Sequence, residues 1–224
     1  MTDHSTPPIA TPVARRKPKA DIETIGGRKL KPSTLMMGHG YDPTLSEGAL
    51  KPPIFLTSTF AFESAAAGKK FFEHITGKRE GPADGLVYSR FNGPNQEILE
   101  DRLAVWDEAD DSLVFSSGMS AIATMLLALV GQNDVIVHSG PLYAATETLI
   151  ARILSRFGVG FVDFPAGATR GEIDAILDRA KKLADEQGGK VALVYLESPA
   201  NPTNALVDVE AVRAAHDSAF PGDQ

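Results

Sequence analysis

Several short segments of the sequence combine residue types that could bind a small anionic ligand. One is the turn Phe-Ser-Ser-Gly-Met-Ser at residues 115–120, which follows an expected strand and opens an expected helix. Small residues let the backbone approach a ligand, and the first turn of a helix offers free N–H groups and the positive end of the helix dipole. The turn therefore suits a phosphate, although Ser-Ser-Gly before a helix is also ordinary N-terminal capping.

A second segment is Tyr-Ser-Arg at residues 88–90, just before the Asn-Gly-Pro-Asn turn at 92–95. The guanidinium of Arg90 can hold a phosphate through two parallel hydrogen bonds, and the phenol of Tyr88 adds one directed donor. A tyrosine and an arginine that merely lie on the surface are the alternative.

Two further segments follow expected strands. Tyr143 comes after a strand that ends near His138, and its ring could stack on a flat heteroaromatic cofactor at the strand end, where open α/β sheets bind ligands. His138 could act as an acid or a base, but we favour a strand-end residue with satisfied hydrogen bonds. In Glu-Ser-Pro-Ala-Asn-Pro-Thr at 197–203, the prolines stiffen the loop. Asn201 either presents its amide to a ligand or bonds its own backbone, and the role of Glu197 is left open.

The pattern of apolar residues predicts the elements that position these segments. Strands are expected at 112–115, 134–138, 160–164 and 191–197, and helices at 95–106, 119–130, 146–157, 170–187 and 208–216. Alternating helices and apolar strands predict an α/β domain with a parallel-rich sheet between helices. Residues 41–85, with a β-prone run at 54–60 and a helix at 64–75, look like an extended arm. Residues 1–40 are expected to be a disordered basic tail, or else a contact arm.

Composition narrows the function classes. A net charge of −7 with 23% charged residues gives no basic field for nucleic acid. Cysteine is absent, which excludes disulfide scaffolds, thiol nucleophiles and Cys-built metal sites, and we expect no metal. The longest apolar stretch, residues 121–130, is far shorter than the ~20 residues that span a bilayer, and no apolar signal core begins the chain. We therefore expect a cytoplasmic protein without a membrane or nucleic-acid partner.

In their order along the chain, the motifs resemble those of the Cys/Met-metabolism PLP-dependent enzymes, which include cystathionine γ-synthase, cystathionine lyases and methionine γ-lyase. The resemblance covers residues 41–216. It rests on Pro-Pro-Ile at 52–54, Thr-Ser-Thr-Phe at 57–60, Tyr-Ser-Arg at 88–90, Ser-Ser-Gly-Met at 116–119, Tyr143 and the segment 197–203. It implies an aspartate-aminotransferase-like fold (fold type I), in which residues 41–85 form a subunit-contact arm and residues 86–224 form part of the cofactor-binding large domain.

The resemblance also implies how pyridoxal 5′-phosphate (PLP) is held at its phosphate. Tyr88 and Arg90 would reach the phosphate in the site of a neighbouring subunit, so that the protein is a homo-oligomer, a dimer of dimers in the family. The backbone N–H groups of Gly118 and Met119 would bind the same phosphate.

For the cofactor ring, the resemblance assigns stacking and a part in catalysis to Tyr143, and places Asn201 beside the ring hydroxyl. The implied chemistry is γ-elimination or γ-replacement on a small amino-acid substrate. The motifs do not separate γ-synthase from γ-lyase or β-lyase.

The chain also departs from the family pattern. It has Tyr-Ala-Ala-Thr at 143–146 where the family has Tyr-Gly-Gly-Thr, and a longer turn at 92–95. The aspartate that pairs with the pyridine nitrogen and the Ser-x-Thr-Lys motif with the Schiff-base lysine do not occur within the 224 residues. The expectation is a truncated chain that is inactive alone. There are two alternatives. One is a non-catalytic pseudo-subunit that associates with a full-length homologue, and the other is a domain that binds some other phosphate ligand.

Overall fold

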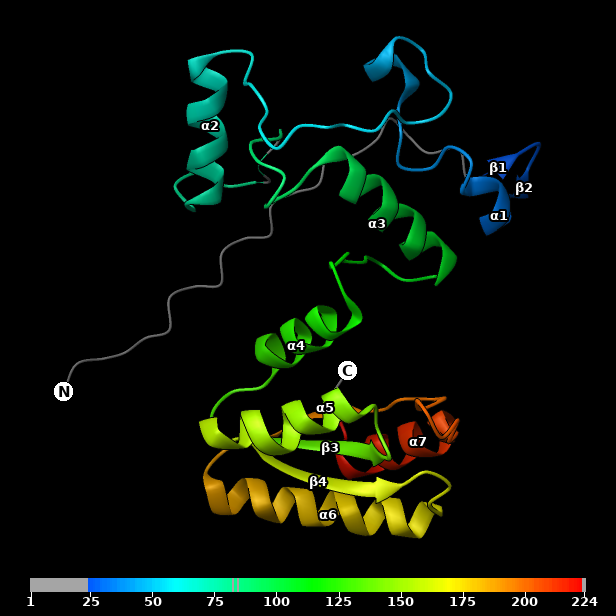
Figure 1. The fold of residues 1–224 in the computed structure, drawn as a ribbon, viewed down its shortest axis with the longest axis vertical. Helices are drawn as coiled ribbons and strands as arrows, with labels where there is room; N and C mark the ends of the chain where they lie inside the picture. The colour runs from blue at the N-terminus through cyan, green and yellow to red at the C-terminus, as the bar shows by residue number, and fades with distance from the viewer. Residues whose placement is uncertain (1–23, 82, 84, 223–224) are drawn as a thin grey trace, which may run out of the picture. The chain divides into compact units, whose positions relative to one another are not determined.

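The computed structural model describes residues 24–222 apart from 82 and 84. By its internal contacts the chain divides into two compact parts, which we call unit 1 (Met1–Val114) and unit 2 (Phe115–Gln224). Each unit is described by itself below (Figure 1).

The sheet of unit 2 consists of three parallel strands. These are β3 (Val135–Gly140), β4 (Gly160–Pro165) and β5 (Val191–Tyr195), in the order β4-β3-β5. In the register of the sheet, His138 lies opposite Asp163 of β4 and Tyr195 of β5. The carboxyl ends of β3 and β5 therefore meet at the same edge, as expected from the alternation of strands and helices.

Helices connect these strands and follow the expected ranges closely. They are α4 (Gly118–Leu129), α5 (Ala144–Thr148), a π-helical turn (Leu149–Ile153), a 3₁₀ turn (Leu154–Phe157), α6 (Arg170–Gln187) and α7 (Val209–Ala219). The helix expected at 146–157 thus begins earlier, at Ala144, and changes its hydrogen-bonding pattern along its length. Gly158, in the left-handed conformation, ends it.

Both faces of the sheet carry a hydrophobic core. On one face Val137 and Phe164 pack against α6 and α7, which contribute Ile173, Leu177 and Val212. A second cluster, of which Leu126, Ile136 and Ile150 are members, packs on the other face against α4 and the helical segment after Tyr143. In Figure 1, α5 and α6 accordingly lie on opposite sides of β3 and β4. This confirms the expected fold class.

The strands differ in how completely they are covered. The first five residues of β3 are buried, as an apolar central strand requires. On β4 the burial alternates, so that Val162 and Phe164 are buried while Phe161 and Asp163 are exposed. The expectation of strands covered on both faces therefore holds for β3 and only in part for β4.

Helix α6 has well-defined caps at both ends. Thr169 and Glu172 form a capping box, in which the Thr169 hydroxyl accepts from the Glu172 amide while the Glu172 carboxylate accepts from the amide and hydroxyl of Thr169. At the other end Gly188 is left-handed (φ 71°), and the amides of Gly188 and Gly189 donate to Asp185 and Ala184. These two hydrogen bonds form the Schellman motif, in which helices commonly end.

The capping box predicts a pH dependence of stability. Hydrogen bonds from Thr169 hold the pKa of the Glu172 carboxyl below its usual value of 4.5. A lowered folded-state pKa contributes stability above the unfolded pKa, and that contribution is lost as the pH falls through the folded pKa. We expect Glu172→Gln to be less stable than wild type at neutral pH, with the difference shrinking below pH 4.5 and lost once the pH is below the lowered folded-state pKa. Urea unfolding of both proteins across this range measures it, and a difference that stays constant with pH would contradict the assignment.

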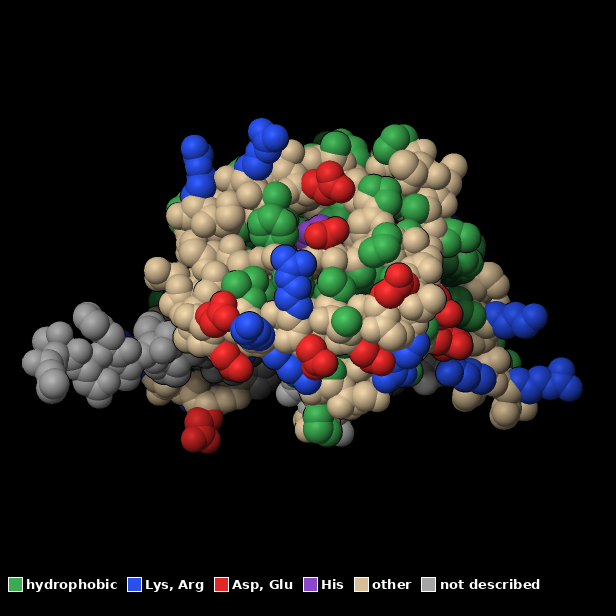
Figure 2. Space-filling view, turned by 90° about the horizontal axis from the view of Figure 1, so that it is seen from below, with side chains coloured by type: hydrophobic (Ala, Val, Ile, Leu, Met, Phe, Trp, Pro, Cys, Tyr) green, Lys and Arg blue, Asp and Glu red, His purple; other side chains and the backbone are tan. Residues whose placement is uncertain are grey.

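Charged side chains of both signs cover the outer face of unit 2. Along α6 the ion pairs Arg170–Asp174, Lys181–Asp178 and Lys182–Glu186 connect neighbouring turns. Figure 2 shows acidic and basic side chains interspersed on this side. Such exposed pairs contribute little to stability, and they leave no field of a single sign on this face.

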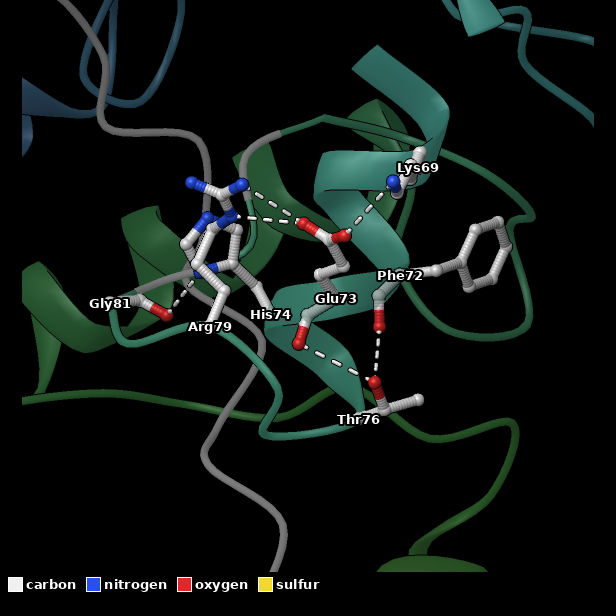
Figure 3. A network of polar contacts seen from close by, with 7 residues as sticks. All are labelled: Lys69, Phe72, Glu73, His74, Thr76, Arg79 and Gly81. Carbon is white, nitrogen blue, oxygen red and sulfur yellow. Dashed lines mark hydrogen bonds and ion pairs between the residues drawn. The ribbon is translucent and has the colours of Figure 1, made fainter. Parts of the chain in front are cut away.

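Unit 1 contains two longer helices, α2 (Ala65–Ile75) and α3 (Pro94–Trp106). The hydroxyl of Ser64 caps α2, and Gly93-Pro94 opens α3, as the turn at 92–95 predicts. The carboxylate of Glu73 on α2 pairs with Arg79 (3.0 Å) and Lys69 (3.7 Å), and the buried His74 bonds through Nδ1 to the Gly81 carbonyl (3.0 Å), as Figure 3 shows. These contacts fasten the loop after α2 to the helix.

The expectation of a disordered tail is wrong for residues 24–40. Thr24–Ile25 (β1) pairs antiparallel with Arg28–Lys29 (β2), and Pro32–Leu35 (α1) follows. Helix α1 contacts α3, and the Arg102 side chain donates to the His39 carbonyl (3.1 Å). These contacts hold the segment to unit 1. The proline-rich part of the expected tail, residues 1–23, lies outside the described residues.

Two β-prone segments of unit 1 do not become strands. Among the described residues, 112–115 pair with no strand; the Ser112 hydroxyl donates to the Glu100 carbonyl, and the Val114 amide, which a ladder would use, donates to the Glu100 carboxylate. The expectation of a strand there was therefore wrong. Within 54–60 the β pairing seen among the described residues is an isolated bridge from Thr59 to Tyr88. Residues Pro43–Ser46 form a 3₁₀ turn.

Candidate functional site

The start of α4 leaves two backbone donors free. Ser117 caps the helix, accepting from the Ser120 amide through its hydroxyl (3.1 Å) and from the Ala121 amide through its carbonyl (3.1 Å). Within the described part of the chain, the amides of Gly118 and Met119 have no hydrogen-bond acceptor. These are two of the four N–H groups that every helix start leaves unpaired, and they are available to an anion.

The space beside these donors is open. A Cβ atom built on Gly118 would meet no atom within 4 Å. The cap also explains the local fold, since the Ser120 hydroxyl bonds back to the Ser117 amide and so closes a capping box. The capping interpretation is confirmed by Ser117 and Ser120, and it is compatible with a phosphate site because the amides of Gly118 and Met119 keep their donors.

Tyr143 lies in the turn between β3 and α5, and carboxylates hold the backbone of that turn. The Leu142 amide donates to Glu147 (3.1 Å), and the Tyr143 amide donates to Glu197 (2.6 Å). Tyr143 is 40% exposed, whereas the neighbouring Leu142 is buried. The turn therefore fixes the Cα position of Tyr143 while leaving its ring accessible to a ligand.

Glu197 joins the ends of β3 and β5. Besides the Tyr143 amide, its carboxylate accepts from the buried Thr146 hydroxyl (3.0 Å) and from the Tyr195 phenol (3.0 Å). Its own amide donates to the Ser139 hydroxyl (3.3 Å). Burial, with the Glu197 carboxylate beside it, raises the pKa of Tyr195 to about 12, so the phenol remains a donor.

Met119 and Tyr143 line the same shallow hollow of about 680 Å³ in unit 2. That volume lies in the range of small-molecule sites, though the hollow is wide open. Ala144 and Ala145 form part of its wall, at the positions where the sequence departs from the family pattern. The Met119 sulfur also lies 3.9 Å from the Thr146 hydroxyl, which connects the start of α4 to the Glu197 cluster.

The loop after β5 is fastened by residues other than Asn201. The Ala200 and Ala205 backbones form a bridge, and the hydroxyls of Ser198 and Thr203 accept from the amides of Val207 and Ala205. The side chain of Asn201 is exposed and has no hydrogen-bond partner among the described residues. The alternative in which Asn201 bonds its own backbone is therefore not seen, and its amide is free for a ligand.

Tyr88 and Arg90 belong to unit 1. The Arg90 guanidinium lies over the rings of Tyr88 (4.8 Å to the centroid) and Phe91 (5.4 Å), and Arg90 is exposed while Tyr88 is partly buried. The two predicted phosphate contacts are thus adjacent to each other. Gly118, Met119 and Tyr143 are brought together in unit 2.

His138 is a structural residue of the sheet. Its ring is 7% exposed, Nδ1 bonds to the Ser139 carbonyl (2.8 Å), and the ring stacks on Phe161 at 6.0 Å. This agrees with a satisfied strand-end histidine rather than an acid or base. The sequence analysis named Glu197 as part of the motif at 197–203 but left its role open, and the structure shows which groups its carboxylate bonds.

The lysines of unit 2 lie away from this site. Lys181 and Lys182 are on α6, and Lys190 comes just before β5, at the amino end of the sheet. In the described residues no group of three or more His, Cys, Asp or Glu could hold a metal ion. None of the helices described is both long and apolar enough to cross a membrane.

Comparison with known proteins shows which protein family this chain resembles. The family model described as Cys/Met metabolism PLP-dependent enzyme matches residues 33–220. An L-methionine gamma-lyase from Pseudomonas deceptionensis is 33% identical over 182 residues, which cover 81% of this chain and 41% of the relative. An O-succinylhomoserine sulfhydrylase from Mycobacterium tuberculosis is 30% identical over 216 residues, covering 95% of this chain and 44% of the relative. The chain thus spans about two-fifths of the length of these relatives.

Solved structures share the fold. The metB protein of Corynebacterium glutamicum superposes with a TM-score of 0.65 at 23% identity, over 84% of this chain and 43% of that one. A putative O-acetylhomoserine (thiol)-lyase (metY) of Campylobacter jejuni, whose structure holds a pyridoxyl-lysine phosphate, gives 0.67 at 23% identity over 85% and 42%. The parallel sheet with helices on both faces is therefore the fold of type I PLP enzymes.

Proposed function

The chain belongs to the Cys/Met metabolism PLP-dependent enzyme family, and we propose that unit 2 holds the phosphate and ring of PLP at the carboxyl edge of its sheet. The observation that carries this proposal is the pair of free amides at Gly118 and Met119, next to the exposed ring of Tyr143. An anion on the amides and a flat ring against the tyrosine are complementary to the two ends of this cofactor.

When bound, the cofactor supplies an electron sink for amino-acid chemistry. The residues of this chain bind and orient it. Gly118 and Met119 donate two N–H groups to the phosphate, Tyr143 stacks on the ring and assists proton transfer, and Asn201 donates to the ring hydroxyl from the loop after β5.

Tyr88 and Arg90 complete the phosphate site from a second copy of the chain. The exposed guanidinium, stacked on Tyr88, presents its N–H groups outward from unit 1. This requires at least a dimer, and the family resemblance extends it to a dimer of dimers with residues 41–85 as the contact arm. The compartment we propose is the cytoplasm.

The reaction we propose for the complete protein is γ-elimination or γ-replacement on a sulfur amino acid or a homoserine ester. Support comes from the relatives, which carry the names methionine gamma-lyase and O-succinylhomoserine sulfhydrylase. The 224-residue polypeptide alone is proposed to be inactive, because none of the lysines of unit 2, Lys181, Lys182 and Lys190, lies at the carboxyl edge.

Cofactor binding by the chain can be separated from covalent attachment. Pyridoxamine 5′-phosphate has no aldehyde, so it reports the non-covalent site without reacting with surface lysines. We expect the purified 224-residue chain to bind it saturably in calorimetry. After incubation with PLP and borohydride reduction, we expect peptide mapping to find only scattered, substoichiometric labelling of exposed lysines.

Each arm of this experiment has a contrary result. Absence of saturable pyridoxamine phosphate binding would overturn the cofactor site in unit 2. Stoichiometric labelling of one lysine, lost when that lysine is replaced by arginine, would overturn the proposal that the chain alone lacks a covalent anchor. Inorganic phosphate binding of equal strength would favour a general phosphate site instead.

A second candidate, a non-catalytic subunit that associates with a full-length homologue, is favoured by the apolar surface of unit 1. Leu50, Ile54, Leu56 and Phe91 are 81%, 79%, 94% and 67% exposed. A contiguous exposed apolar patch is typical of a surface that binds a partner. Mixing the chain with a tagged full-length relative tests it, since stable mixed oligomers are expected and their absence at micromolar concentration excludes this role.

A further inference from the structure

We infer that Glu197 is a positioning residue that fixes Tyr143 for cofactor stacking. The inference rests on the proposed function, because it concerns how the same site is built. It goes further by giving a role to an acid that neither sequence motifs nor family comparison assigned, and by separating the residue that would touch the cofactor from the one that holds it in place.

The hydrogen-bonding capacity of the Glu197 carboxylate is largely used by three donors. Oε2 accepts the Tyr143 amide at 2.6 Å, and Oε1 accepts the hydroxyls of Thr146 and Tyr195, both at 3.0 Å. An ionised carboxylate is acceptor-only and has about four lone-pair sites. Charge-assisted bonds of this kind are roughly twice as strong as neutral ones. The carboxylate is therefore committed to structure and is not free to act on a substrate.

The donors come from both sides of the site. Tyr143 and Thr146 belong to the turn and first helical residues after β3, while Tyr195 belongs to β5. Glu197 thus joins the carboxyl ends of two neighbouring strands. Its negative charge also lies at the N-terminus of α5, where it interacts favourably with the helix dipole.

The hydrogen bond from the Tyr143 amide to Glu197 matters because the Tyr143 side chain makes no such bond of its own to a described residue. We refer to the three hydrogen bonds that Glu197 accepts as the clamp. Tyr143 is the N-terminal cap of α5, but its side chain makes no capping bond, and in the described structure its ring has no hydrogen-bond or aromatic partner. The hydrogen bonds that Tyr143 makes to described residues all involve its backbone. A ring awaiting a ligand must be pre-positioned through its Cα, and the amide bond to Glu197 does this.

Within the clamp, Tyr195 stays protonated at neutral pH and so remains a hydrogen-bond donor to Glu197. Its phenol donates to Glu197, and burial raises its pKa to about 12. Thr146, fully buried, is the second fixed hydroxyl. The other titratable groups near the turn include Glu147, which bonds the Leu142 amide, and His138, which bonds the Ser139 carbonyl. Neither is bonded to Glu197.

The experiment compares three variants of the full 224-residue chain. Glu197→Ala removes all three acceptors. Glu197→Gln keeps the shape, and its amide can serve the Tyr143 N–H with oxygen and the two hydroxyls with N–H groups, so it is the conservative rescue. Glu172→Ala is the matched control, because it removes another carboxylate that accepts an amide and a hydroxyl at a helix start of unit 2, far from Tyr143 in sequence.

The first measurement is hydrogen exchange of the Tyr143 amide by NMR, without any ligand. We expect exchange to accelerate at least tenfold in Glu197→Ala, with Glu197→Gln and Glu172→Ala close to wild type. The second is the dissociation constant for pyridoxamine 5′-phosphate. We expect Glu197→Ala to weaken it about tenfold, with most of the affinity restored in Glu197→Gln.

The outcomes distinguish the two proposals. If wild type binds pyridoxamine phosphate and Glu197→Ala binds it equally well, the positioning role is wrong while the cofactor site stands. If wild type does not bind it, the proposed function fails, and the positioning role fails with it, whatever the amide shows. If Glu172→Ala weakens binding as much as Glu197→Ala, the effect is general destabilisation, and the inference is overturned.

Discussion

Gly189→Ala is expected to destabilise the protein by about 3 kcal/mol, because the new methyl group would overlap the backbone of the neighbouring strand. A Cβ built on Gly189 collides with the carbonyl of Asn133 and approaches the Asp134 amide. Both groups belong to the backbone that leads into β3, so no side-chain rotation can relieve the contact. The start of β5 would be pushed away from β3, where the Val135 amide donates to the Lys190 carbonyl (2.8 Å).

The adjacent glycine provides the matched control for this prediction. Gly188 has the left-handed φ of 71°, but a Cβ there meets no atom within 4 Å. Gly188→Ala should therefore cost about 1 kcal/mol, the conformational penalty alone. Urea unfolding of the two variants and wild type, followed by far-ultraviolet circular dichroism, gives the comparison. Equal losses in both variants would mean that the close approach of Gly189 to β3 is absent.

The second large effect concerns ligand binding rather than stability. Gly118→Asp is expected to weaken pyridoxamine 5′-phosphate about a hundredfold or more, because a carboxylate placed in the open space beside the free amides repels a phosphate. The same acid should leave the fold intact. The first turn of α4 has no acidic residue, and an acid near the N-terminus of a helix is favourable.

Two controls make this prediction specific. Gly118→Asn has nearly the same size without the charge, so its loss of affinity should be much smaller. Gly171→Asp places the same acid in the first turn of α6, where a Cβ also has open space, and should not change affinity. Calorimetry measures the dissociation constants, and thermal unfolding checks that all variants fold. If Gly118→Asp binds as wild type does, the phosphate does not lie at the start of α4.

The sequence predicts an element well when the interactions that determine the element join residues close together in the sequence. The bounds expected for α6 agree with the structure because Ile173, Leu177, Ala180 and Ala184 recur with helical spacing between a Thr-x-x-Glu box and a glycine stop. The segment 112–115 has strand composition too, but the Val114 amide donates to the Glu100 carboxylate instead of to a neighbouring strand. The pattern of residues 112–115 does not indicate this hydrogen bond, because its acceptor is the side chain of Glu100 on the preceding helix α3.

The candidate site likewise has features that the sequence predicts and features that it does not. The order of its motifs predicted the family, and the end of β3 predicted the edge at which Tyr143 lies. In the described part of the chain, the strand expected before Gly118 and Met119 does not form, so their place beside Tyr143 is a result of the tertiary structure. The capping box of Ser117 and Ser120 shows that the turn uses some residues for the helix and leaves two amides for a ligand. Sequence alone could not separate these two uses, because Ser-Ser-Gly satisfies both patterns.

What the sequence by itself determined about this protein is its family and most of its elements, since motif identity and apolar periodicity are local properties; the residues that would touch the cofactor are a prediction from the same motifs. What only the tertiary structure decided is how those residues are held. The bonds from Tyr143, Thr146 and Tyr195 to Glu197 join positions up to 54 residues apart, across two parallel strands. These hydrogen bonds form only when the sheet brings the ends of β3 and β5 together. The local sequence pattern therefore does not indicate the positioning role that we infer for Glu197.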